Sequence, residues 1–514
     1  NFQTHLNLAR LRRATPLGPK INATSTVEIR QNQPVLTLNC EGRGEEITPS
    51  VVRFDPEEVI VGKPALNSAI AKPDRVVREV KRHMGEEWEY KSPEGEIYKP
   101  EEVSSHVVRK LKQAVETKVN GKVTQAVVSH PAEFGSMERE ATKTAAEIAG
   151  FEDVHLITEP EAAALSELKQ GDKLTGRIMV VDIGGTTTDV SILEISRRDI
   201  TTKTIEGDLN LAGTNLTNSL VQEIEDEIGK IQEPDLKQEL FKRAEEAKID
   251  LSDQNQVSFS IPTPTGLKSF QFTREEVEKM FQPFVDDIAE TCKTALANIS
   301  QEWKSLDNLL LVGGTSRVPL IKKTLQEVSG LDPVVSAQPD KAIAIGASVK
   351  AASMQDINVL SDSGGYILPP EHNSVLSKPI GVKAIDAESG EPVNEIILKK
   401  DTPLPADNTE VFTTERDRQT NVRITLLEGR SRKPKNCTIL GEEGGHVLEG
   451  IDPKPAGVPR IELTLTIDEE GLLTGEAVDR DSGTPLKFRQ KIPELLTGRD
   501  KQESKERVKA KSTN

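Results

Sequence analysis

The apolar pattern in the middle of the chain places a glycine turn between two strands, in the stretch Val180–Ser191 (VVDIGGTTTDVS). One apolar run ends at Val181, and a period-two apolar pattern resumes at Val190, beyond the pair Gly184–Gly185. Period-two alternation is typical of a strand, so we expect the glycines in a hairpin and not at a helix start. The rest of the chain is organised around this hairpin.

Strands and helices alternate on both sides of the hairpin. The predicted elements are two strands within Thr26–Leu38, strands at Gln125–Val128 and Leu309–Val312, and helices at Asp74–Met84, Ser136–Ala149, Thr214–Ile228, Pro234–Asp250, Thr273–Asn298 and Asp340–Met354. The order strand, strand, loop, helix occurs over residues 26–85 and again over 178–228. Two such halves facing each other predict a two-lobed α/β fold with a cleft between the lobes.

The pattern changes after Met354. Residues 355–373 are polar and contain glycine and proline, which is typical of a linker. Short alternating segments with turn signals then predict an antiparallel β-sandwich over 374–494, with strands at Pro379–Ala384, Glu395–Leu398, Glu410–Thr414, Asn421–Leu427 and Arg460–Ile467. The last stretch, 495–514, is charged and is expected to be a disordered tail.

Composition narrows the class of protein. The chain has 514 residues, enough for two to four domains, and a net charge of −17, which argues against nucleic acid or an anionic membrane as partner. No apolar run approaches the ~18 residues of a transmembrane helix, and no signal peptide is visible. The three scattered cysteines exclude a disulfide framework and a cysteine-based zinc site; they are Cys40, Cys292 and Cys437. We expect a cytoplasmic protein.

Residues 1–20 form an atypical N-terminal segment. They are basic in an acidic chain and show no clean periodicity. Either the true start is missing or this segment is foreign to the fold, and its arginines leave a transit peptide open.

The hairpin carries chemistry suited to phosphate. A Gly-Gly pair lets backbone amides approach an anion closely, and the hydroxyls of residues 186–188 add donors. Asp182 and Asp189 can hold a hydrated cation that offsets phosphate charge. A glycine-rich hairpin without a ligand is the alternative, but the flanking acids and hydroxyls favour phosphate. The chain has no Walker loop, since Gly62-Lys63 is followed by proline.

Two further segments have the form of helix starts. Thr158-Glu159-Pro160-Glu161 has the Thr-x-x-Glu pattern of a capping box, which places Glu159 in the first turn of a helix. An acid there is usually a favourable charge near the helix dipole. Ser316 is expected to cap the helix that Pro319 begins, so that backbone amides point at whatever lies before them.

In combination, these motifs resemble the 70-kDa heat-shock (DnaK-like) chaperones. The resembling segments are DIGGTTTDVS, SHPAEFGSMEREATKTAAEIAGF, TEPEAAAL and VGGTSRVPLIKK, followed by TEVFTTERDRQTNVRITLLEG and IDPKPAGVPRIELTLTIDEEGLL. The resemblance runs from about Ser25 to Lys491. It implies a two-lobed, actin-like α/β ATPase domain over 21–354 and a β-sandwich peptide-binding domain, which actin-like filaments and sugar kinases lack.

The resemblance also implies roles for individual residues. It implies that Lys81 is the catalytic lysine and that Glu159 is the acid near the attacking water. Asp182 would be the acid on the magnesium side, and Thr187 the threonine that contacts phosphate. Asp189 closes the hairpin beside the metal. The implied ATP-binding residues are Gly184, Gly185, Thr186, Thr187, Gly213, Glu245, Lys248, Gly313, Gly314, Thr315, Arg317 and Asp340.

Four residues are expected to connect the nucleotide site with a client. The resemblance assigns Pro131 and Arg139 to interlobe signalling. Val422 and Ile424 alternate with polar neighbours and are candidates for peptide binding, although a place in the sandwich core explains either of them equally well.

The sequence departs from the family pattern in four places. The first phosphate loop, Gly-x-Asp-x-Gly-Thr-Thr, should lie just before Ser25, where LGPKINAT stands; Pro19 replaces its acid and Ile21 a glycine. Thr214 and Asn215 replace an acidic pair. The linker is reduced to residues 359–362, and the helical lid after the sandwich is absent. We therefore expect ATP binding more than efficient hydrolysis.

The expected function is an ATP-regulated, lidless chaperone that binds extended apolar peptides of unfolded proteins. Its cofactors are ATP/ADP and Mg²⁺, and its partners are unfolded polypeptides with J-domain and nucleotide-exchange co-chaperones. The alternative is a non-hydrolysing nucleotide-dependent adaptor that holds one dedicated protein. A sugar-kinase-like enzyme is disfavoured because no sugar-binding insert is apparent.

Overall fold

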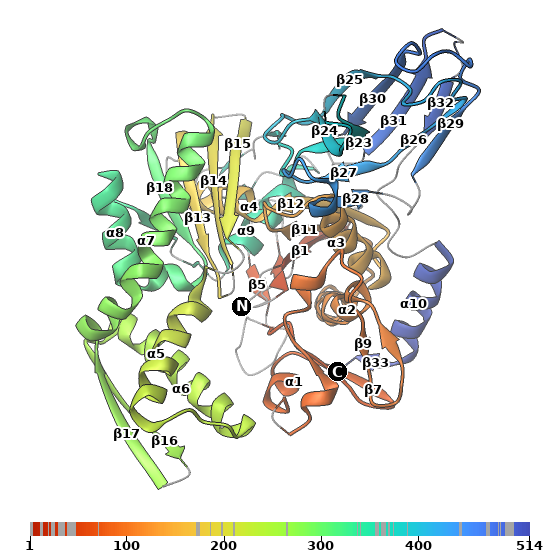
Figure 1. Ribbon diagram of the computed structural model, residues 1–514. Coiled ribbons are helices and arrows are strands. Elements are labelled where there is room, and N and C mark those ends of the chain that lie inside the picture. Colours follow the sequence, from red (N-terminus) through yellow and green to blue (C-terminus); the bar gives the residue numbers. More distant parts are fainter. Residues whose placement is uncertain are drawn as a thin grey trace.

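Two lobes of sheet and helix lie side by side, and a β-sandwich lies against both of them (Figure 1). The structure is a computed structural model that describes the chain apart from residues 1–3, 11–13, 19, 22–25, 29–35, 39–47, 70, 171–174, 186, 197–198, 209–210, 264–265, 337, 340, 355–358, 361–365, 368–370, 374, 388, 441–444, 469–472, 482, 484, 489–497 and 514.

The first lobe is built on a sheet of order β12-β11-β1-β2-β4-β5, with β3 paired to β1. Its strands are β1 (Thr4–Arg10), β2 (Ala14–Gly18), β3 (Lys20–Ile21), β4 (Thr26–Glu28), β5 (Leu36–Leu38), β11 (Gln125–His130) and β12 (Asp153–Thr158). The antiparallel pair of β4 and β5 confirms the two strands predicted within Thr26–Leu38. β1 runs antiparallel to β11, and β11 runs parallel to β12.

Smaller elements complete this lobe around the helices α2 and α3. They are α1 (Lys63–Asn67), α2 (Pro100–Val119), α3 (Ser136–Ile148), β6 (Val52–Phe54), β7 (Glu58–Val61), β8 (Val76–Val77), β9 (Tyr90–Lys91) and β10 (Ile97–Tyr98). A cluster of valines with Phe54, Tyr98 and Phe151 forms the core beneath α2.

The second lobe is built on a sheet of order β19-β18-β13-β14-β15-β22. Its strands are β13 (Gly176–Ile183), β14 (Thr188–Ile195), β15 (Asp199–Asp208), β18 (Asn308–Val312), β19 (Val334–Val335) and β22 (Glu371–Asn373). The other elements are α5 (Gly213–Ile228), α6 (Pro234–Asp253), α7 (Arg274–Asn298), α8 (Pro319–Ser329) and the hairpin β16 (Gln256–Thr263) with β17 (Gly266–Thr273).

Two helices of small residues, α4 (Glu159–Gln170) and α9 (Ala342–Ser353), pack together where the lobes meet. A Cβ on Gly346 of α9 would lie 1.5 Å from the carbonyl oxygen of Ala162 in α4, so only glycine permits this approach. Both helices share one core with residues of β11, β12, β13 and β18. This contact fixes the lobes against each other at the ends of their central strands.

The C-terminal part is the predicted sandwich. One sheet has the order β24-β23-β27-β28 and the other β25-β30-β31-β32, with β26 and β29 as a separate pair. The strands are β23 (Ile380–Ile385), β24 (Pro392–Leu398), β25 (Ala406–Phe412), β26 (Asn421–Ile424), β27 (Leu426–Glu428), β28 (Thr438–Leu440), β29 (His446–Glu449), β30 (Ile461–Ile467), β31 (Leu473–Asp479) and β32 (Pro485–Phe488). Ile424 is 4% exposed in the core, and Val422 packs against that core half-buried.

The segment predicted as a linker, 355–373, contains short strands. β20 (Val359–Leu360) pairs with β21 (Tyr366–Ile367), and β22 extends the second-lobe sheet by pairing in parallel with β15. In the part of the chain that the structure describes, no helix is both long and apolar enough to cross a membrane.

The helix predicted over Asp74–Met84 is wrong. Two short 3₁₀ turns, Pro73–Arg75 and Val80–His83, flank strand β8 instead. Val76 and Val77 are β-branched and pair with β6, which favours extended backbone. Glu79 has a φ of 55°, a left-handed conformation that interrupts any helix.

The disordered tail predicted over 495–514 is also wrong for its described residues. Helix α10 (Gly498–Ala510) and strand β33 (Ser512–Thr513) lie against α2, α3 and β7, at the right of Figure 1. Val508 is 1% exposed against Ile148, and Lys501 forms an ion pair with Glu147 at 2.6 Å. Charge complementarity with the acidic lobe stabilises a segment whose composition alone suggested disorder.

Candidate functional site

The glycine turn is a hairpin, as the pattern predicted. β13 and β14 pair in antiparallel orientation, with Gly176 opposite Ile195 at one end and Ile183 opposite Thr188 at the turn. In the turn, the Gly184 amide donates to the Thr187 carbonyl at 2.9 Å. Asp182 and Asp189 are direct cross-strand partners and are 4% and 3% exposed. The hairpin therefore presents two buried carboxyl groups beside its glycines.

These acids make the site strongly negative. Burial raises the pKa of Asp189 well above its usual value, and the charges of Glu159, Asp182 and Glu133 raise it further. Lys81 acts in the opposite direction, and Thr187 Oγ1 donates to Asp189 Oδ2 at 3.4 Å. A hydrated divalent cation would relieve this repulsion, so the residues present fit Mg²⁺. Among the described residues, no three His, Cys, Asp or Glu side chains are grouped to ligate a metal directly.

Lys81 and Glu159, 78 residues apart, form a buried ion pair. Lys81 Nζ lies 2.8 Å from Glu159 Oε1, and the two side chains are 10% and 5% exposed. The capping box is confirmed, because the Thr158 amide donates to Glu161 Oε2 at 3.3 Å and the Glu161 amide to Thr158 Oγ1 at 3.4 Å. The start of α4 thus holds Glu159 in position, and the ion pair with Glu159 holds the Lys81 side chain in position.

Two other loops meet the hairpin at its glycines. The Gly213 amide donates to the Gly184 carbonyl at 3.0 Å, and Thr315 Oγ1 donates to the same oxygen at 2.7 Å. The Thr214 amide donates to the Gly185 carbonyl at 2.7 Å. The start of α5 and the turn before α8 therefore converge on the hairpin turn, as a polyphosphate cradle requires.

Gly313 is a position of this cradle where backbone conformation and space both restrict the residue. Its φ is +80°, and an added Cβ would lie 2.4 Å from both Asp182 Oδ1 and the Ile183 carbonyl oxygen. Both the conformation and the space demand glycine here.

We expect Gly313→Ala to weaken ADP binding at least about tenfold, because the methyl group displaces Asp182 and the hairpin end. Gly330→Ala is the matched control. Gly330 also has a positive φ, +73°, but nothing lies within 4 Å of its added Cβ. Calorimetric titration with Mg·ADP should show near-normal affinity for the control, whose unfolding free energy falls by about 1 kcal/mol. Equal affinities for both variants would contradict the cradle.

The remaining implied ligands are spread around this centre. Lys248 is buried and donates to the Gly213 carbonyl at 3.0 Å and to Thr217 Oγ1 at 2.8 Å, so it supports the first turn of α5. Burial lowers its pKa. Glu245 is half-buried in the preceding turn of α6, and Gly314 and Arg317 are exposed. Thr186 and Asp340 lie outside the described residues.

Three polar residues serve the site differently from their sequence expectation. Thr214 Oγ1 donates to the Gly185 carbonyl, and Asn215 Oδ1 accepts from the Ala212 amide at 2.9 Å, so the pair that replaces two acids anchors the loop. Ser316 does not cap α8; its Oγ donates to the Gly313 carbonyl at 2.6 Å, and Val318 is the N-cap. Ser316 therefore stabilises the tight glycine turn.

The site is connected to the sandwich through residues that the sequence reading missed. Lys81 Nζ lies 5.7 Å from the ring centre of Phe134, and the Phe134 carbonyl accepts from Ser377 Oγ at 2.9 Å. The Pro131 carbonyl accepts from the Phe134 amide at 3.1 Å. Phe134 thus contacts Lys81, Pro131 and the Ser377 segment of the sandwich.

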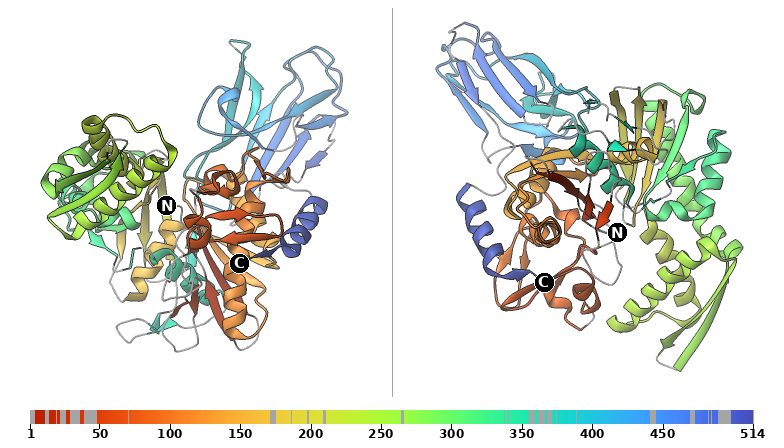
Figure 2. Two further views of the ribbon diagram at one scale, coloured as in Figure 1. Left: turned by 90° about the horizontal axis from the view of Figure 1, so that it is seen from below. Right: turned by 180° about the vertical axis from the view of Figure 1, so that it is seen from behind.

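Ion pairs and hydrogen bonds hold the sandwich against both lobes. Figure 2 shows the arrangement of these parts from two further sides. Glu428 accepts from the Ser136 amide at 3.0 Å and from its hydroxyl at 2.9 Å, and Lys378 pairs with Glu138 at 2.7 Å. On the second lobe, Lys400 pairs with Glu206 at 2.5 Å. No sequence pattern marked these residues, because each becomes a partner only in the folded chain.

Glu133 makes this contact sensitive to pH. Its pKa is raised to about 7, mainly by burial and also by the charge of Glu206, whereas Lys400, Arg430 and Lys378 act to lower it. A carboxyl group whose pKa is raised in the folded state stabilises the docked arrangement fully at pH values below its pKa in the unfolded chain, which is near 4.5. That stabilisation is lost as the pH rises through 7. The pKa values of Glu428 and Asp401, also at this contact, are raised as well.

We therefore expect the free energy of unfolding to fall with rising pH between about 4.5 and 7, by up to about 1 kcal/mol per pH unit. Glu133→Gln should flatten this slope. The control is Glu138→Gln, which removes a paired charge from the same contact and should keep the slope. Urea titrations across this pH range measure it, and an unchanged slope in Glu133→Gln would contradict the assignment.

Comparison with known proteins identifies the family. The family model described as Hsp70 protein matches residues 21–94 and 90–513. Chaperone protein DnaK of Thermus thermophilus is 32% identical over 510 residues, covering 91% of this chain and 79% of its own length. Chaperone protein DnaK of Halobacterium salinarum is 31% identical over 479 residues, covering 91% of this chain and 73% of its own length. With this fold and this site, the chain belongs to the Hsp70 family of chaperones.

Proposed function

We propose that this chain binds ATP and ADP with Mg²⁺ at the β13–β14 hairpin and uses the nucleotide state to control peptide binding by its sandwich. The observation that carries this proposal is the buried Lys81–Glu159 pair, which lies beside the acidic hairpin and touches Phe134, a direct contact of the sandwich. The family match favours this chaperone function over the adaptor with one dedicated partner.

The chain's own residues perform positioning and charge neutralisation, which is most of what phosphoryl transfer to water requires. Lys81, held by Glu159, orients the attacking water and offsets charge on the γ-phosphate. The Glu159 carboxylate accepts the proton that leaves this water. Thr187 and the amides of the glycine turn hold the phosphate oxygens. Asp182 and Asp189 would hold a hydrated Mg²⁺, which would supply positive charge against the polyphosphate.

Phe134 transmits the state of the site. A shift of Lys81 toward phosphate weakens its contact with the Phe134 ring, and Phe134 is hydrogen-bonded to Pro131 and Ser377. The sandwich is held at the same place by Glu428 and Lys378. Nucleotide binding therefore changes how firmly the sandwich docks, and docking changes its access to peptide.

The clients are extended apolar segments of unfolded polypeptides, and the protein acts in the cytoplasm with J-domain and nucleotide-exchange partners. Val422, half-buried on β26, is the more accessible of the two candidate peptide contacts, whereas Ile424 is in the core. Ile424 contacts a peptide only if β26 and β29 separate from the rest of the sandwich.

The test combines nucleotide and client binding on the full chain. Calorimetry should show saturable binding of Mg·ADP and Mg·ATP, and fluorescence anisotropy should show binding of several unrelated Leu-rich peptides and of a reduced, unfolded protein. Val422→Asp should weaken peptide binding, while Val411→Asp, at an exposed valine of β25, is the control. Nucleotide binding without binding of any unfolded client would overturn the proposal in favour of the adaptor.

A further inference from the structure

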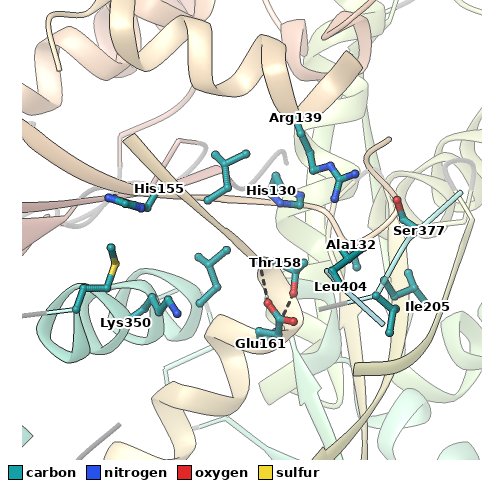
Figure 3. A pocket seen from close by; sticks show the side chains of 14 residues that line it. His130, Ala132, Arg139, His155, Thr158, Glu161, Ile205, Lys350, Ser377 and Leu404 are labelled. Carbon is teal, nitrogen blue, oxygen red and sulfur yellow. Dashed lines mark hydrogen bonds between the residues drawn. The ribbon is translucent and has the colours of Figure 1, made fainter. Parts of the chain in front are cut away.

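A cavity of about 240 Å³ lies where both lobes meet the sandwich (Figure 3). Its walls come from β11, β12, α3 and α4 of the first part of the chain, from β15 and α9, and from the segments around Val375, Ser377 and Leu404. At ~30 Å³ per water molecule, this volume holds about eight waters. It is separate from the glycine cradle, none of whose residues lines it.

Arg139 is a wall residue whose charge is not satisfied by hydrogen bonds. It extends from α3 toward His130, Thr158 and Ser377 (Figure 3), and it is 8% exposed. Its Nε and Nη2 atoms are buried without a hydrogen-bond partner among the described residues. The carboxylates of Glu428, Glu138 and Asp468 act on its charge, and both oxygens of Glu428 accept from Ser136. A buried guanidinium left in this state is costly, so the site favours an anion.

The other polar walls leave room for negative charge. Glu161 is the one carboxylate among the lining residues, and Thr202 Oγ1 at 2.9 Å and the Thr158 amide at 3.3 Å already donate to it. Lys350 adds a second cationic side chain to the wall. An oxyanion in the cavity would accept from the nitrogen atoms that Arg139 leaves without a hydrogen-bond partner in the described part of the chain.

His130 adds a requirement for a proton on the ligand. Its Nδ1 lies 2.7 Å from the Pro131 carbonyl oxygen, which can only accept, so Nδ1 carries the hydrogen. Burial lowers the pKa of this ring to about 3, so the ring is neutral and Nε2 is an acceptor. An oxyanion that also bears a hydroxyl can accept from Arg139 and donate to His130.

We propose that this cavity is a binding site for a phosphate group that retains a proton, as inorganic phosphate or the phosphomonoester of a small molecule. Arg139 binds its oxygens and His130 accepts from its hydroxyl. Because the walls come from both lobes and the sandwich, the ligand stabilises the docked arrangement of the domains. The inference does not depend on nucleotide binding at the hairpin.

The experiment titrates the full chain with inorganic phosphate at constant ionic strength, in the presence of a non-hydrolysable ATP analogue. It measures the heat of binding by calorimetry and the temperature of thermal unfolding. Saturable binding and a rise in unfolding temperature are expected. Arg139→Met should weaken phosphate binding at least about tenfold. Arg430→Met is the matched control, since it removes a half-exposed positive charge from the same domain contact but does not line the cavity. Ala132→Leu, which fills the cavity and keeps the arginine, should also abolish binding.

Sulfate, which carries no proton at neutral pH, and two phosphomonoesters of different size are compared with inorganic phosphate. Sulfate should bind more weakly, and tighter binding of an ester would identify the phosphomonoester as the occupant. No saturable binding, or equal binding by the parent and Arg139→Met, would overturn the proposal.

Discussion

Replacing residues Leu17–Thr24 with the family-like loop Gly-Ile-Asp-Leu-Gly-Thr-Thr-Asn should raise ATP turnover about 100- to 1000-fold above that of the parent chain. We expect the parent to hydrolyse ATP near the background rate. In the resembled fold, this loop clamps phosphate opposite Gly184–Thr187, and its acid shares the hydrated metal. Pro19 offers neither a charge nor an N–H donor, and Ile21 places a branched side chain where backbone should approach oxygen.

The structure shows what the replacement must preserve. Leu17 and Gly18 pair with Glu28 and Val27 of β4, so the first two residues of the new loop continue a strand of the first-lobe sheet. The family match begins at residue 21, after Pro19. Steady-state turnover at saturating Mg·ATP compares the parent with the repaired chain. Robust turnover by the parent would show that another residue supplies the missing acid. A repaired chain that stays inactive would place the defect elsewhere, with Thr214 and Asn215 as the next residues to replace by acids.

In the repaired chain, Lys81→Ala should reduce the single-turnover rate of ATP hydrolysis about 100- to 1000-fold while changing ATP affinity less than about tenfold. The lysine charge matters most as the γ-phosphate leaves, so its loss affects the transition state more than the bound nucleotide. The substitution also leaves Glu159 buried without its ion-pair partner. Lys81→Ala combined with Glu159→Gln removes that uncompensated charge and should be equally slow.

Arg82→Ala is the control for Lys81→Ala. Arg82 belongs to the same 3₁₀ turn, but it is 43% exposed and pairs with Glu79 at 3.6 Å on the surface. Its replacement should leave the single-turnover rate within about twofold of the parent, since exposed ion pairs contribute little. If Lys81→Ala also hydrolyses ATP at the parental rate, Lys81 is a structural partner of Glu159 and not a catalytic residue.

The local features of the site could be predicted from sequence because short-range patterns specify them. Period-two apolar alternation around Gly184–Gly185 predicted the hairpin, and Thr158 with Glu161 predicted the start of α4. Both depend on residues within a few positions of one another. The motif resemblance placed Lys81 and Glu159 in one site, and in the folded chain they form an ion pair at 2.8 Å.

Features that depend on tertiary contacts were missed or mispredicted. The backbone of Lys81 is a 3₁₀ turn because β8 pairs with β6 just before it, and no local pattern revealed that pairing. Helix α10 is stabilised by acids of the first lobe that lie far away in sequence. Glu133 and Glu428 resemble surface acids in sequence, and only the docked sandwich buries them.

The most direct test of the coupling between nucleotide site and sandwich is the dissociation rate of a fluorescent Leu-rich peptide from the full chain, measured in Mg·ADP and in Mg·ATP. Since we propose that ATP binding alone shifts docking, we predict release about 5- to 150-fold faster in ATP even where hydrolysis is near background. Phe134→Ala, which removes the ring beside Lys81, should bring the two rates together. Equal rates in ADP and ATP for a parent chain that binds both nucleotides and the peptide would contradict the account.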